Sequence, residues 1–563
     1  MLRRASAAAL SAAYLAAAPL AAQNMAELQF SKPVRVSGGI SASGYAVAGG
    51  GDRFAGDRLG GVVAANLTFR VADAWSIPLR AAFSNQGSRF SGPSLARFGL
   101  SPRYKWLTLH GGHRHYSLSR FITNGGTVLG GGVEVRLANF QALAFYGSLA
   151  NDFGLPAEYV GLVDTPLEPY ARRTAGGKVG FGGGRANVEL SVLRVVDLEG
   201  SGSADSLAAL GVNPGASASV ALKTGFRFAR VLALTLEACG NGITDNRADD
   251  AIADDEWGGL ADDLDWLLPV NASSRYALAY AGELALDLPG FSLGLAYEHV
   301  DPYFNSFALG SLQNDFDNYL LRTRFSLLER RLNVSGSFGV QRNNTLPSGA
   351  TTEQRLIANA NLTYAPNELL SLTGGYNNFS SEPVARVVEV ADSLRLTTNN
   401  QGYTVNARGR LPGGQQRHEL TAMLNLQRFE VLRGERADVA NATRGAHVGY
   451  HYTVRETRLR LGGALTYTGF TQPGTPEVDR YGLRLDAARR LGERVGARAS
   501  WRIDQNNSDG ERDGLVLGAT AGLSAQFAGG VSASLSANWI NRRTTRLAPF
   551  DQLRSSLQFS KSF

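Results

Sequence analysis

Apolar and polar side chains alternate in segments of about 10–14 residues that recur along almost the whole chain. In the segment YLLRTRFSL (319–327), Arg322 and Arg324 alternate with apolar side chains and a threonine. A period of two places one set of side chains on each face of a β-strand. Strands in soluble proteins are usually only about 5–6 residues long, and no helical periodicity separates these segments. The pattern therefore predicts an all-β fold built from long strands.

The connections between these segments alternate between short and long. Short connections include 104–106, 137–140 and 527–531, whereas those at 151–173 and 244–273 are long and polar. A transmembrane β-barrel that is inserted from one side has this asymmetry. We therefore predict a transmembrane, antiparallel, up-and-down β-barrel with short periplasmic turns and long extracellular loops.

The alternation predicts about 26 strands, an even number as in bacterial single-chain barrels. About 24 strands fit nearly as well, because the boundaries within 86–118 are weakly marked. The predicted strands are 33–47, 59–71, 75–85, 92–104, 107–118, 127–137, 140–150, 174–183, 185–196, 217–229, 230–243, 274–286, 290–300, 317–328, 331–342, 354–365, 368–380, 400–411, 417–430, 443–455, 456–469, 479–489, 493–506, 514–527, 530–543 and 551–562.

Only helices and closed barrels span a bilayer, because lipid offers no water to satisfy free backbone groups. No segment after the N-terminal region has the roughly 18 consecutive apolar residues that a spanning helix needs. A secreted β-solenoid or a multidomain β-sandwich is the alternative, and it would show a fixed repeat, of which we find none. Cys239 is the single cysteine, which excludes an internal disulfide framework and a CxxC site.

Residues 1–22 have the layout of a cleaved signal peptide. Arg3 and Arg4 precede a run rich in Ala and Leu, which ends in small residues that suit signal-peptidase cleavage. A first transmembrane helix is the alternative, but the run is weakly hydrophobic. The predicted organisation is a signal peptide (1–22), a short periplasmic segment (23–32) and the barrel (33–563).

The sequence ends in SLQFSKSF, in which Leu557, Phe559 and Phe563 share one face of the last predicted strand. In this pattern the chain resembles Gram-negative outer-membrane β-barrel proteins, which commonly end in an aromatic residue preceded by apolar residues at every second position. The resemblance implies location in the outer membrane, contact with its lipid, and a C-terminal signal at these three residues that the barrel-assembly machinery reads. Lys561 departs from the pattern, although its stem can snorkel near the interface. We expect the last strand to close against 33–47.

The predicted segment before the first strand is too short for a plug domain. The resemblance therefore does not extend to TonB-dependent receptors, which have such a plug, or to the lipopolysaccharide-exporting barrel, which has a periplasmic domain. A circular barrel of this strand number would enclose a wide hole. We expect the lumen to be narrowed by infolded loops, by flattening, or by a partner such as a lipoprotein or a surface protein.

Arginine is concentrated on the faces predicted to point away from lipid. Most of these residues come from consecutive predicted strands within 456–506, so they would form a ladder on one wall. Such a wall favours anionic solutes. The alternative is an internal mesh with Glu419, Glu456 and Asp486 that fills and rigidifies the lumen. The predicted lumen-facing basic wall consists of Arg322, Arg324, Arg458, Arg460, Arg480, Arg484, Arg498 and Arg502.

The connection 244–273 is the most acidic part of the chain. Clustered carboxylates can bind Ca²⁺, but the spacing of an EF-hand is absent. The loop is expected either to be solvated or to fold inward against the arginines and constrict the pore. The run DQNNSDGERDG (504–514) is predicted to be a hairpin tip. The acidic residues of the loop are Asp249, Asp250, Asp254, Asp255, Glu256, Asp262, Asp263 and Asp265.

Histidine is dense only in HGGHRHYS (110–117), where Ser117 lies nearby. No orienting carboxylate and no hydrolase motif accompany this cluster. We therefore expect no catalytic residue, no cofactor and no metal site. Nucleic-acid binding is not expected, because the basic residues are spread along lumen faces instead of forming an exposed patch.

Three functions fit the sequence. The leading hypothesis is a passive channel or transporter with a loop-constricted, Arg-lined lumen. The second is a structural barrel that takes part in the assembly or secretion of surface proteins. The third, an embedded hydrolase, has the least support.

Overall fold

A computed structural model of the chain describes residues 34–49, 58–72, 74–84, 97–123, 127–149, 170–199, 213–250, 266–308, 313–343, 351–385, 396–433, 436–545 and 548–563. The predicted signal peptide and the segment 23–32 lie outside these residues. The β-segments are β1 (Arg35–Gly49), β2 (Leu59–Val71), β3 (Trp75–Ser84), β4 (Arg97–Leu100), β5 (Arg103–Tyr104), β6 (Leu107–His115), β7 (Thr127–Arg136), β8 (Phe140–Leu149), β9 (Arg172–Gly182), β10 (Ala186–Asp197), β11 (Ala216–Phe228), β12 (Leu232–Thr244), β13 (Ser274–Leu288), β14 (Phe291–Val300), β15 (Phe316–Leu327), β16 (Leu332–Asn343), β17 (Thr351–Tyr364), β18 (Leu370–Ala385), β19 (Leu396–Pro412), β20 (Gln416–Arg433), β21 (Arg436–Val454), β22 (Leu459–Thr471), β23 (Val478–Leu491), β24 (Val495–Ser508), β25 (Glu511–Phe527), β26 (Val531–Thr544) and β27 (Phe550–Ser562).

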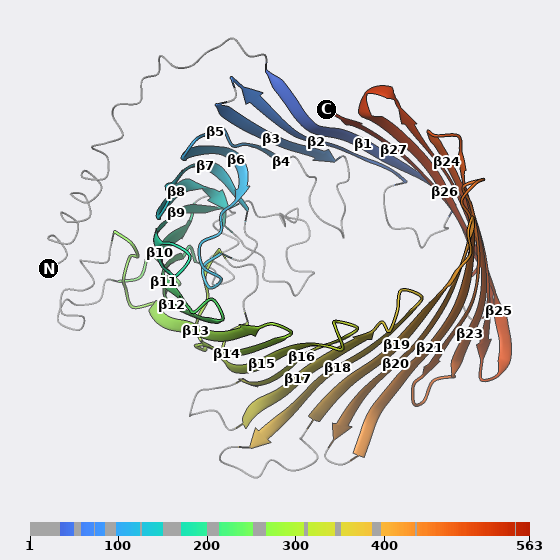
Figure 1. Cartoon of the computed structure of the whole chain (residues 1–563). Helices are drawn as coiled ribbons and strands as arrows, with labels where there is room; N and C mark the ends of the chain where they lie inside the picture. Colours follow the sequence, from blue (N-terminus) through green and yellow to red (C-terminus); the bar gives the residue numbers. More distant parts are fainter. Residues whose placement is uncertain are drawn as a thin grey trace.

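The strands form one closed antiparallel barrel (Figure 1). Each strand pairs with the strands before and after it, and β1 pairs with β27, so the sheet has no edge. Segments β4 and β5 both pair with β3 and β6 and are one strand interrupted at Ser101 and Pro102. The 27 segments are therefore 26 strands. The predicted up-and-down barrel and the larger of the two predicted strand numbers are confirmed.

Helical structure is minimal in the described ranges. One short 3-10 turn, Ala528–Gly530, lies between β25 and β26. None of the helices in the described part of the chain is long and apolar enough to span a membrane.

Side chains alternate between an outer apolar face and an inner face. On β23, Tyr481, Leu483 and Leu485 are exposed on the outside, and Gly482 and Arg484 lie between them on the inner side. Paired residues of neighbouring strands share a face. The pairing register therefore shows, for every strand, which residues point outward and which point into the lumen. The outer face is thus apolar, as in barrels that face lipid.

Aromatic pairs form two belts on the outer face. Phe291 and Tyr297 of β14 belong to different belts and are separated by about 20 Å along the strand, at roughly 3.3 Å per residue. Transmembrane barrels carry such girdles at the two membrane interfaces. The belt near the short turns includes Trp75–Tyr104, Phe140–Phe181 and Phe291–Phe325, and the belt near the other end includes Tyr297–Tyr319, Tyr376–Tyr403 and Tyr467–Tyr481.

The predicted contrast between short and long connections holds for the first part of the barrel but not for the last strands. Strands β20 and β21 pair as far as Arg433 and Arg436, and β24 and β25 pair as far as Ser508 and Glu511. The second of these tips is the hairpin predicted in 504–514. At this tip Asp509 (φ 53°) and Gly510 (φ 81°) have positive φ, as two-residue hairpin turns require. Strict alternation of connection length was therefore wrong for these hairpins.

The last strand closes the barrel as predicted. Phe559 pairs with Ala42 and Leu557 with Gly44 of β1, and Leu557, Phe559 and Phe563 are exposed on the outer face. The Nζ of Lys561 lies 5.1 Å from the ring centroid of Phe563. This cation–π contact gives the charged exception in the apolar pattern a local partner. The assembly role of the three apolar residues stays a prediction.

Candidate functional site

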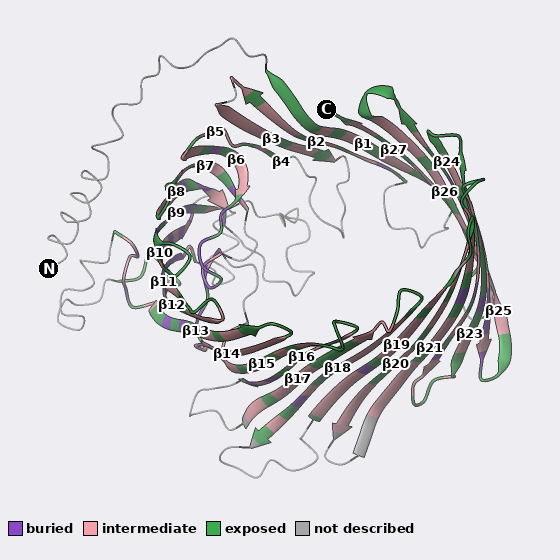
Figure 2. Ribbon diagram, in the orientation of Figure 1, coloured by how far each residue is buried: buried purple, intermediate pink, exposed green. Residues whose placement is uncertain are grey.

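The lumen has a plugged side and an exposed side. In Figure 2, buried residues gather around β10–β13 and a segment inside the barrel. We call the segments Tyr116–Thr123 and Asp301–Ala308 together the plug, because their side chains pack on the inner faces of β8–β14. The strand predicted for 107–118 ends earlier, at His115. The next residues fold into the barrel because they find buried partners there.

The first plug segment is a compact turn. The backbone N–H groups of Ile122 and Thr123 donate to the Ser119 carbonyl at 3.1 and 3.0 Å. The side chains of Phe121 and Ile122 are fully buried. Burying an aromatic and an aliphatic side chain of this size contributes about 1.5–3 kcal/mol each, which offsets the cost of ordering a connection.

Glu237 on β12 anchors this turn. Its side chain is only 4% exposed and accepts hydrogen bonds from the Ser119 hydroxyl and, at 3.2 Å, from the Arg120 N–H. The Arg120 Nε lies 3.7 Å and the Lys223 Nζ 3.9 Å from the same carboxylate. A buried carboxylate needs such partners. Because Ser119 and Arg120 belong to the plug, their contacts with Glu237 attach the plug to the barrel wall.

The second plug segment packs on the first. Phe304 is buried, and its ring centroid lies 6.2 Å from that of Phe121 in an edge-on arrangement. The Ser306 hydroxyl donates to the Ile122 carbonyl at 3.3 Å. The wall beneath is made of small residues, which leave room for the plug. They are Ala221, Cys239, Ala277, Ala279 and Ala281.

Tyr116 extends the plug toward β7 and β8. Its ring stacks on Phe145 at 4.1 Å and 2°. A Cβ on Gly132 would lie 2.6 Å from the Tyr116 hydroxyl, and a Cβ on Gly176 would lie 2.6 Å from the Phe145 ring. Both glycines therefore permit the close approach. Burial raises the pKa of the Tyr116 phenol.

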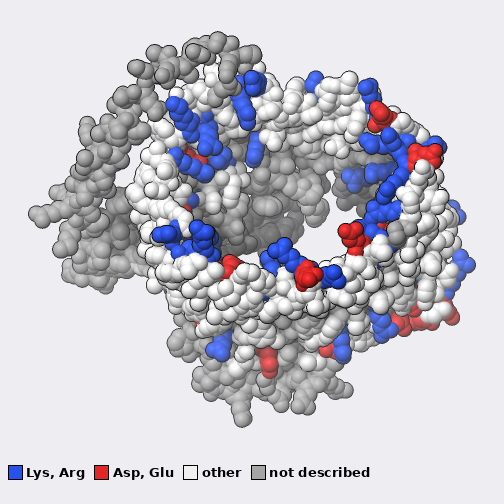
Figure 3. Space-filling model, viewed as in Figure 1, with Lys and Arg blue, Asp and Glu red and all other residues white. Residues whose placement is uncertain are grey.

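The inner face of β19–β27 is polar and rich in arginine. Figure 3 shows Lys and Arg gathered along the inner rim of the opening on the side of these strands. The carboxylates on inward positions of these described strands are fewer, namely Glu419, Asp486, Asp504 and, beside the hairpin tip, Glu511. We call the following inward residues the arginine wall: Arg408, Arg410, Arg417, Arg460, Arg480, Arg484, Arg490, Arg498, Arg502, Arg542 and Arg554.

Five of the predicted residues come together on this wall. Arg484 of β23 pairs across strands with Arg502 of β24. Among the described residues, Arg460, Arg484 and Arg498 have no ion pair or side-chain hydrogen bond, so their charges face the lumen uncompensated. The other two have partners: Arg502 pairs with the buried Asp504, and the Arg480 Nε donates to Asn506 Oδ1 at 2.9 Å. The arrangement therefore mixes the predicted ladder with the predicted mesh.

The other three predicted residues lie elsewhere. Arg322 and Arg324 are inward on β15, away from the ladder, and the Arg322 Nη1 lies 2.9 Å from Glu283 Oε1. Arg458 is in the turn between β21 and β22, with φ of 51°, and its guanidinium donates to the Gly492 carbonyl at 3.1 Å. Arg458 was predicted to face the lumen because the alternation pattern does not show that the chain turns there.

The mesh is centred on Glu419. Its carboxylate accepts from Arg408 Nη2 at 2.8 Å and from Arg417 Nη2 at 3.4 Å, with Arg410 Nε at 3.7 Å. Arg408 and Arg410 were missed by the sequence analysis, although they alternate on β19 with Ala407, Gly409 and the exposed Leu411.

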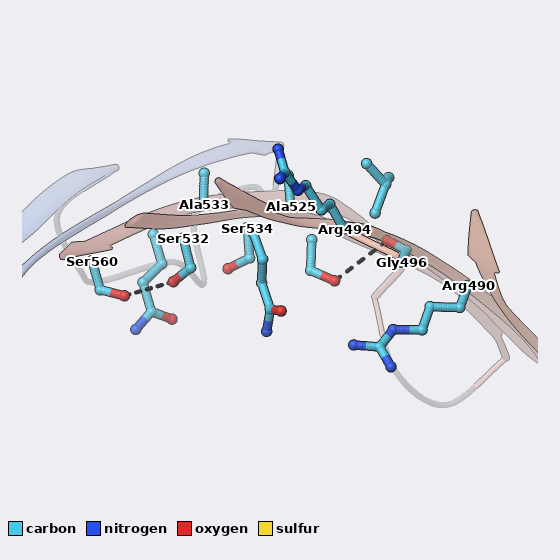
Figure 4. A pocket seen from close by; sticks show the side chains of 12 residues that line it. Arg490, Arg494, Gly496, Ala525, Ser532, Ala533, Ser534 and Ser560 are labelled. Carbon is cyan, nitrogen blue, oxygen red and sulfur yellow. Dashed lines mark hydrogen bonds between the residues drawn. The ribbon is translucent and has the colours of Figure 1, made fainter. Parts of the chain in front are cut away.

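Two adjoining hollows lie in the wall near the short turns. One, of about 480 Å³, is lined by Arg460, Arg490 and Arg498 with small residues between them. The other, of about 260 Å³, shares Arg490 and Ser534 with the first and includes Ser560. Figure 4 shows Arg490 on the same side of the sheet as Ser534 and Ser560. Small side chains between the arginines thus leave space for a solute beside the guanidinium groups.

The acidic connection between β12 and β13 does not reach this wall with its described residues. Leu268 packs against Ala216 and Ala218, which share the outward face of β11 with the exposed Val220 and Leu222. Asp254, Asp255, Glu256, Asp262, Asp263 and Asp265 lie outside the described residues. The described end of this loop therefore lies on the outer face.

The histidine-rich segment contains one Ser–His–Glu contact. The Ser101 Oγ lies 3.0 Å from His110 Nδ1, and Glu134 Oε2 lies 3.3 Å from His110 Nε2. Ser101 also accepts from Arg114 at 3.2 Å, and the His110 side chain is 1% exposed. These contacts bridge the break between β4 and β5, and they do not involve Ser117. No group of described His, Cys, Asp and Glu residues is arranged to bind a metal.

Comparisons with known proteins found structural similarity alone. No protein-family model and no curated protein matches the chain. A BenF-like porin from Pseudomonas fluorescens Pf-5 is 9% identical, with a TM-score of 0.30 over 62% of this chain and 92% of the porin. Pseudomonas aeruginosa OpdK with vanillate is 11% identical, with a TM-score of 0.30 over 62% and 94%. The P pilus usher (PapC) translocation pore is 10% identical, with a TM-score of 0.36 over 94% and 100%. Similarities this low assign no activity, so function is argued from the chain's own residues.

Proposed function

We propose that the chain is a passive channel of the Gram-negative outer membrane whose arginine wall favours anionic solutes. The closed sheet without an edge and the two aromatic belts support insertion in a membrane. The C-terminal pattern of Leu557, Phe559 and Phe563 supports the outer membrane. Passive conduction fits a lumen that has a polar wall along β19–β27.

The observation that carries the proposal is the charge imbalance of that wall. Arginines outnumber carboxylates on the inward positions of the described strands, and Arg460, Arg484 and Arg498 have no described partner. Like charges that line a confined aqueous path raise the local concentration of counter-ions and select by charge. The wall should therefore pass anions more readily than cations.

The plug supports a restricted path. It covers the inner faces of β8–β14, so solutes would pass along the opposite side, where the arginines lie. The plug also separates solutes from much of the apolar inner surface. We infer a passage that is narrower than the barrel and has arginine on one side.

Planar-bilayer recording tests the proposal. Purified barrel in a salt gradient should give a reversal potential of the sign for anions, and replacing Arg460, Arg484 and Arg498 by Ser should move it toward zero. The matched control replaces Arg230, Arg330 and Arg331 by Ser, because these residues lie in the turns β11–β12 and β15–β16 and line neither hollow of the arginine wall.

Two outcomes would overturn the proposal. An unchanged reversal potential in the wall variant would reject the role of these arginines. A barrel that conducts no ions but co-purifies with a stoichiometric protein would favour a structural barrel in surface-protein assembly or secretion.

A further inference from the structure

Arg444 lies on the lipid-facing side of the barrel. Arg444 of β21 pairs with Leu426 of β20, which pairs with Tyr403 of β19. Leu426 and Tyr403 are exposed on the outer face, so Arg444 shares that face. Tyr403 belongs to the aromatic belt away from the short turns. Arg444 therefore sits at the level of a membrane interface.

No described residue gives Arg444 an ion pair or a hydrogen bond. The nearest outward carboxylate along the register is Asp479, two strands away through Gly469, and it accepts from the Tyr467 hydroxyl at 2.8 Å. A charge on the lipid face of a barrel costs stability according to its depth. A guanidinium at this level is best satisfied by an anion supplied from the membrane.

A groove adjoins Arg444 on the same face. It has a volume of about 310 Å³ and is lined by Tyr403, Leu424, Leu426 and Tyr467. The small residue Ala446 faces outward between Leu424 and Tyr467 and forms its floor. Apolar walls, a small floor and one cation at the edge suit an amphiphile with an anionic head.

We propose that this groove binds one phosphate-bearing lipid. Its acyl chain lies over Ala446 between Tyr403 and Tyr467, and its phosphate accepts hydrogen bonds from the Arg444 guanidinium. Arg–phosphate pairs are charge-assisted and often bidentate, which makes them stronger than neutral hydrogen bonds. The site is on the outer face and is separate from the lumen, so it does not depend on conduction.

Native mass spectrometry of the barrel released from mild detergent tests this site. The probes are phosphatidylglycerol and diacylglycerol with the same acyl chains, added at equal concentrations. The intact barrel should retain one phosphatidylglycerol more tightly than diacylglycerol. Arg444→Gln should weaken phosphatidylglycerol retention roughly tenfold, as expected from losing one charge-assisted bond of about 1.4 kcal/mol or more, and should leave diacylglycerol unchanged.

Two further variants separate the parts of the site. Ala446→Leu fills the groove and should reduce phosphatidylglycerol retention with Arg444 in place. Arg428→Gln is the control, because Arg428 is an outward arginine of the adjoining β20 that already pairs with Glu430 at 2.5 Å. Heat-modifiable mobility on gels verifies folding of each variant. Equal retention by the intact barrel and Arg444→Gln, or equal retention of the two lipids, would overturn the proposal, and full retention by Ala446→Leu would reject the groove.

Discussion

The same alternating strand pattern gives a packed core on one side of the lumen and a polar, solvated wall on the other. On β12 and β13, alternate inward positions are small or carboxylate, as in Cys239, Ala279 and Glu237, and a plug covers them. On β23 and β24, the equivalent positions hold Arg484 and Arg502, and no described segment packs on them. Connection lengths follow this division, since β24 and β25 are joined by a two-residue turn. Small inward residues with long connections make a core, whereas long polar residues with short connections make a solvated wall.

Removing the centre of the plug should have the largest effect. Phe121→Ala deletes a fully buried ring that contacts Phe304, which should cost about 3–5 kcal/mol of the local stability of the plug. Hydrogen exchange of the Ile122 and Thr123 amides should accelerate strongly, and single-channel conductance should rise.

The matched control is Phe338→Ala on β16, where the ring is 50% exposed on the outer face. This variant should leave exchange in the plug unchanged. If the Ile122 amide still exchanged slowly in Phe121→Ala, the packing of Phe121 on Phe304 would not be what holds the plug in place. The contrast between a packed side and a solvated side of the lumen would then fail.

Removing the anchor charge should have a smaller effect. Glu237→Gln keeps the shape but weakens the hydrogen bonds from Ser119 and Arg120, which should cost about 1–3 kcal/mol. The control Glu283→Gln breaks an exposed pair with Arg322 and should cost about 0–1 kcal/mol. Exchange at 116–123 should therefore accelerate in Glu237→Gln and stay unchanged in Glu283→Gln; equal exchange in the two variants would show that Glu237 does not hold the plug.

The barrel could be predicted from the sequence far better than the plug. A period of two marks each strand locally, and therefore the final strand and its closure against β1 were predictable from Leu557 and Phe559. The plug depends on a contact between Ser119 and Glu237, which are 118 residues apart. No local pattern marks such a contact, and HGGHRHYS continues the alternation of β6 up to the point where the chain turns inward.

For the arginines, too, the local pattern predicts which face a side chain lies on but not its contacts. Alternation places Arg484 on the inward face, because its neighbours Leu483 and Leu485 on β23 are outward. It does not mark the turn that holds Arg458, because φ above zero at a non-glycine residue has no sequence signal there. Nor does it give the partner of each charge, which depends on which carboxylate the neighbouring strand brings alongside.

A substitution in the tight turn between β24 and β25 should have a moderate effect on stability. Gly510 has φ of 81°, and no atom lies within 4 Å of the position a Cβ would take. Gly510→Ala should therefore cost about 1 kcal/mol through backbone strain alone, and the urea midpoint of unfolding should fall accordingly. Gly184→Ala, in another turn with equal space and no positive φ, should change the midpoint little. Equal shifts would show that the turn at β24–β25 tolerates an ordinary residue.

The smallest expected change in stability concerns the arginine wall itself. Arg484 has no partner among the described residues, so Arg484→Ser should change the free energy of unfolding by no more than about 0.5 kcal/mol, as for other exposed positions. The same variant should still reduce anion preference in bilayer recordings, because selectivity depends on the charge and not on a contact. For Arg484→Ser, the reversal potential should therefore change while the free energy of unfolding in urea does not. For Glu237→Gln, in contrast, stability and conductance should change together. A loss of more than about 1 kcal/mol in Arg484→Ser would mean that this side chain supports the fold, and the exposed side of the lumen would then be a second core and not a solvated wall.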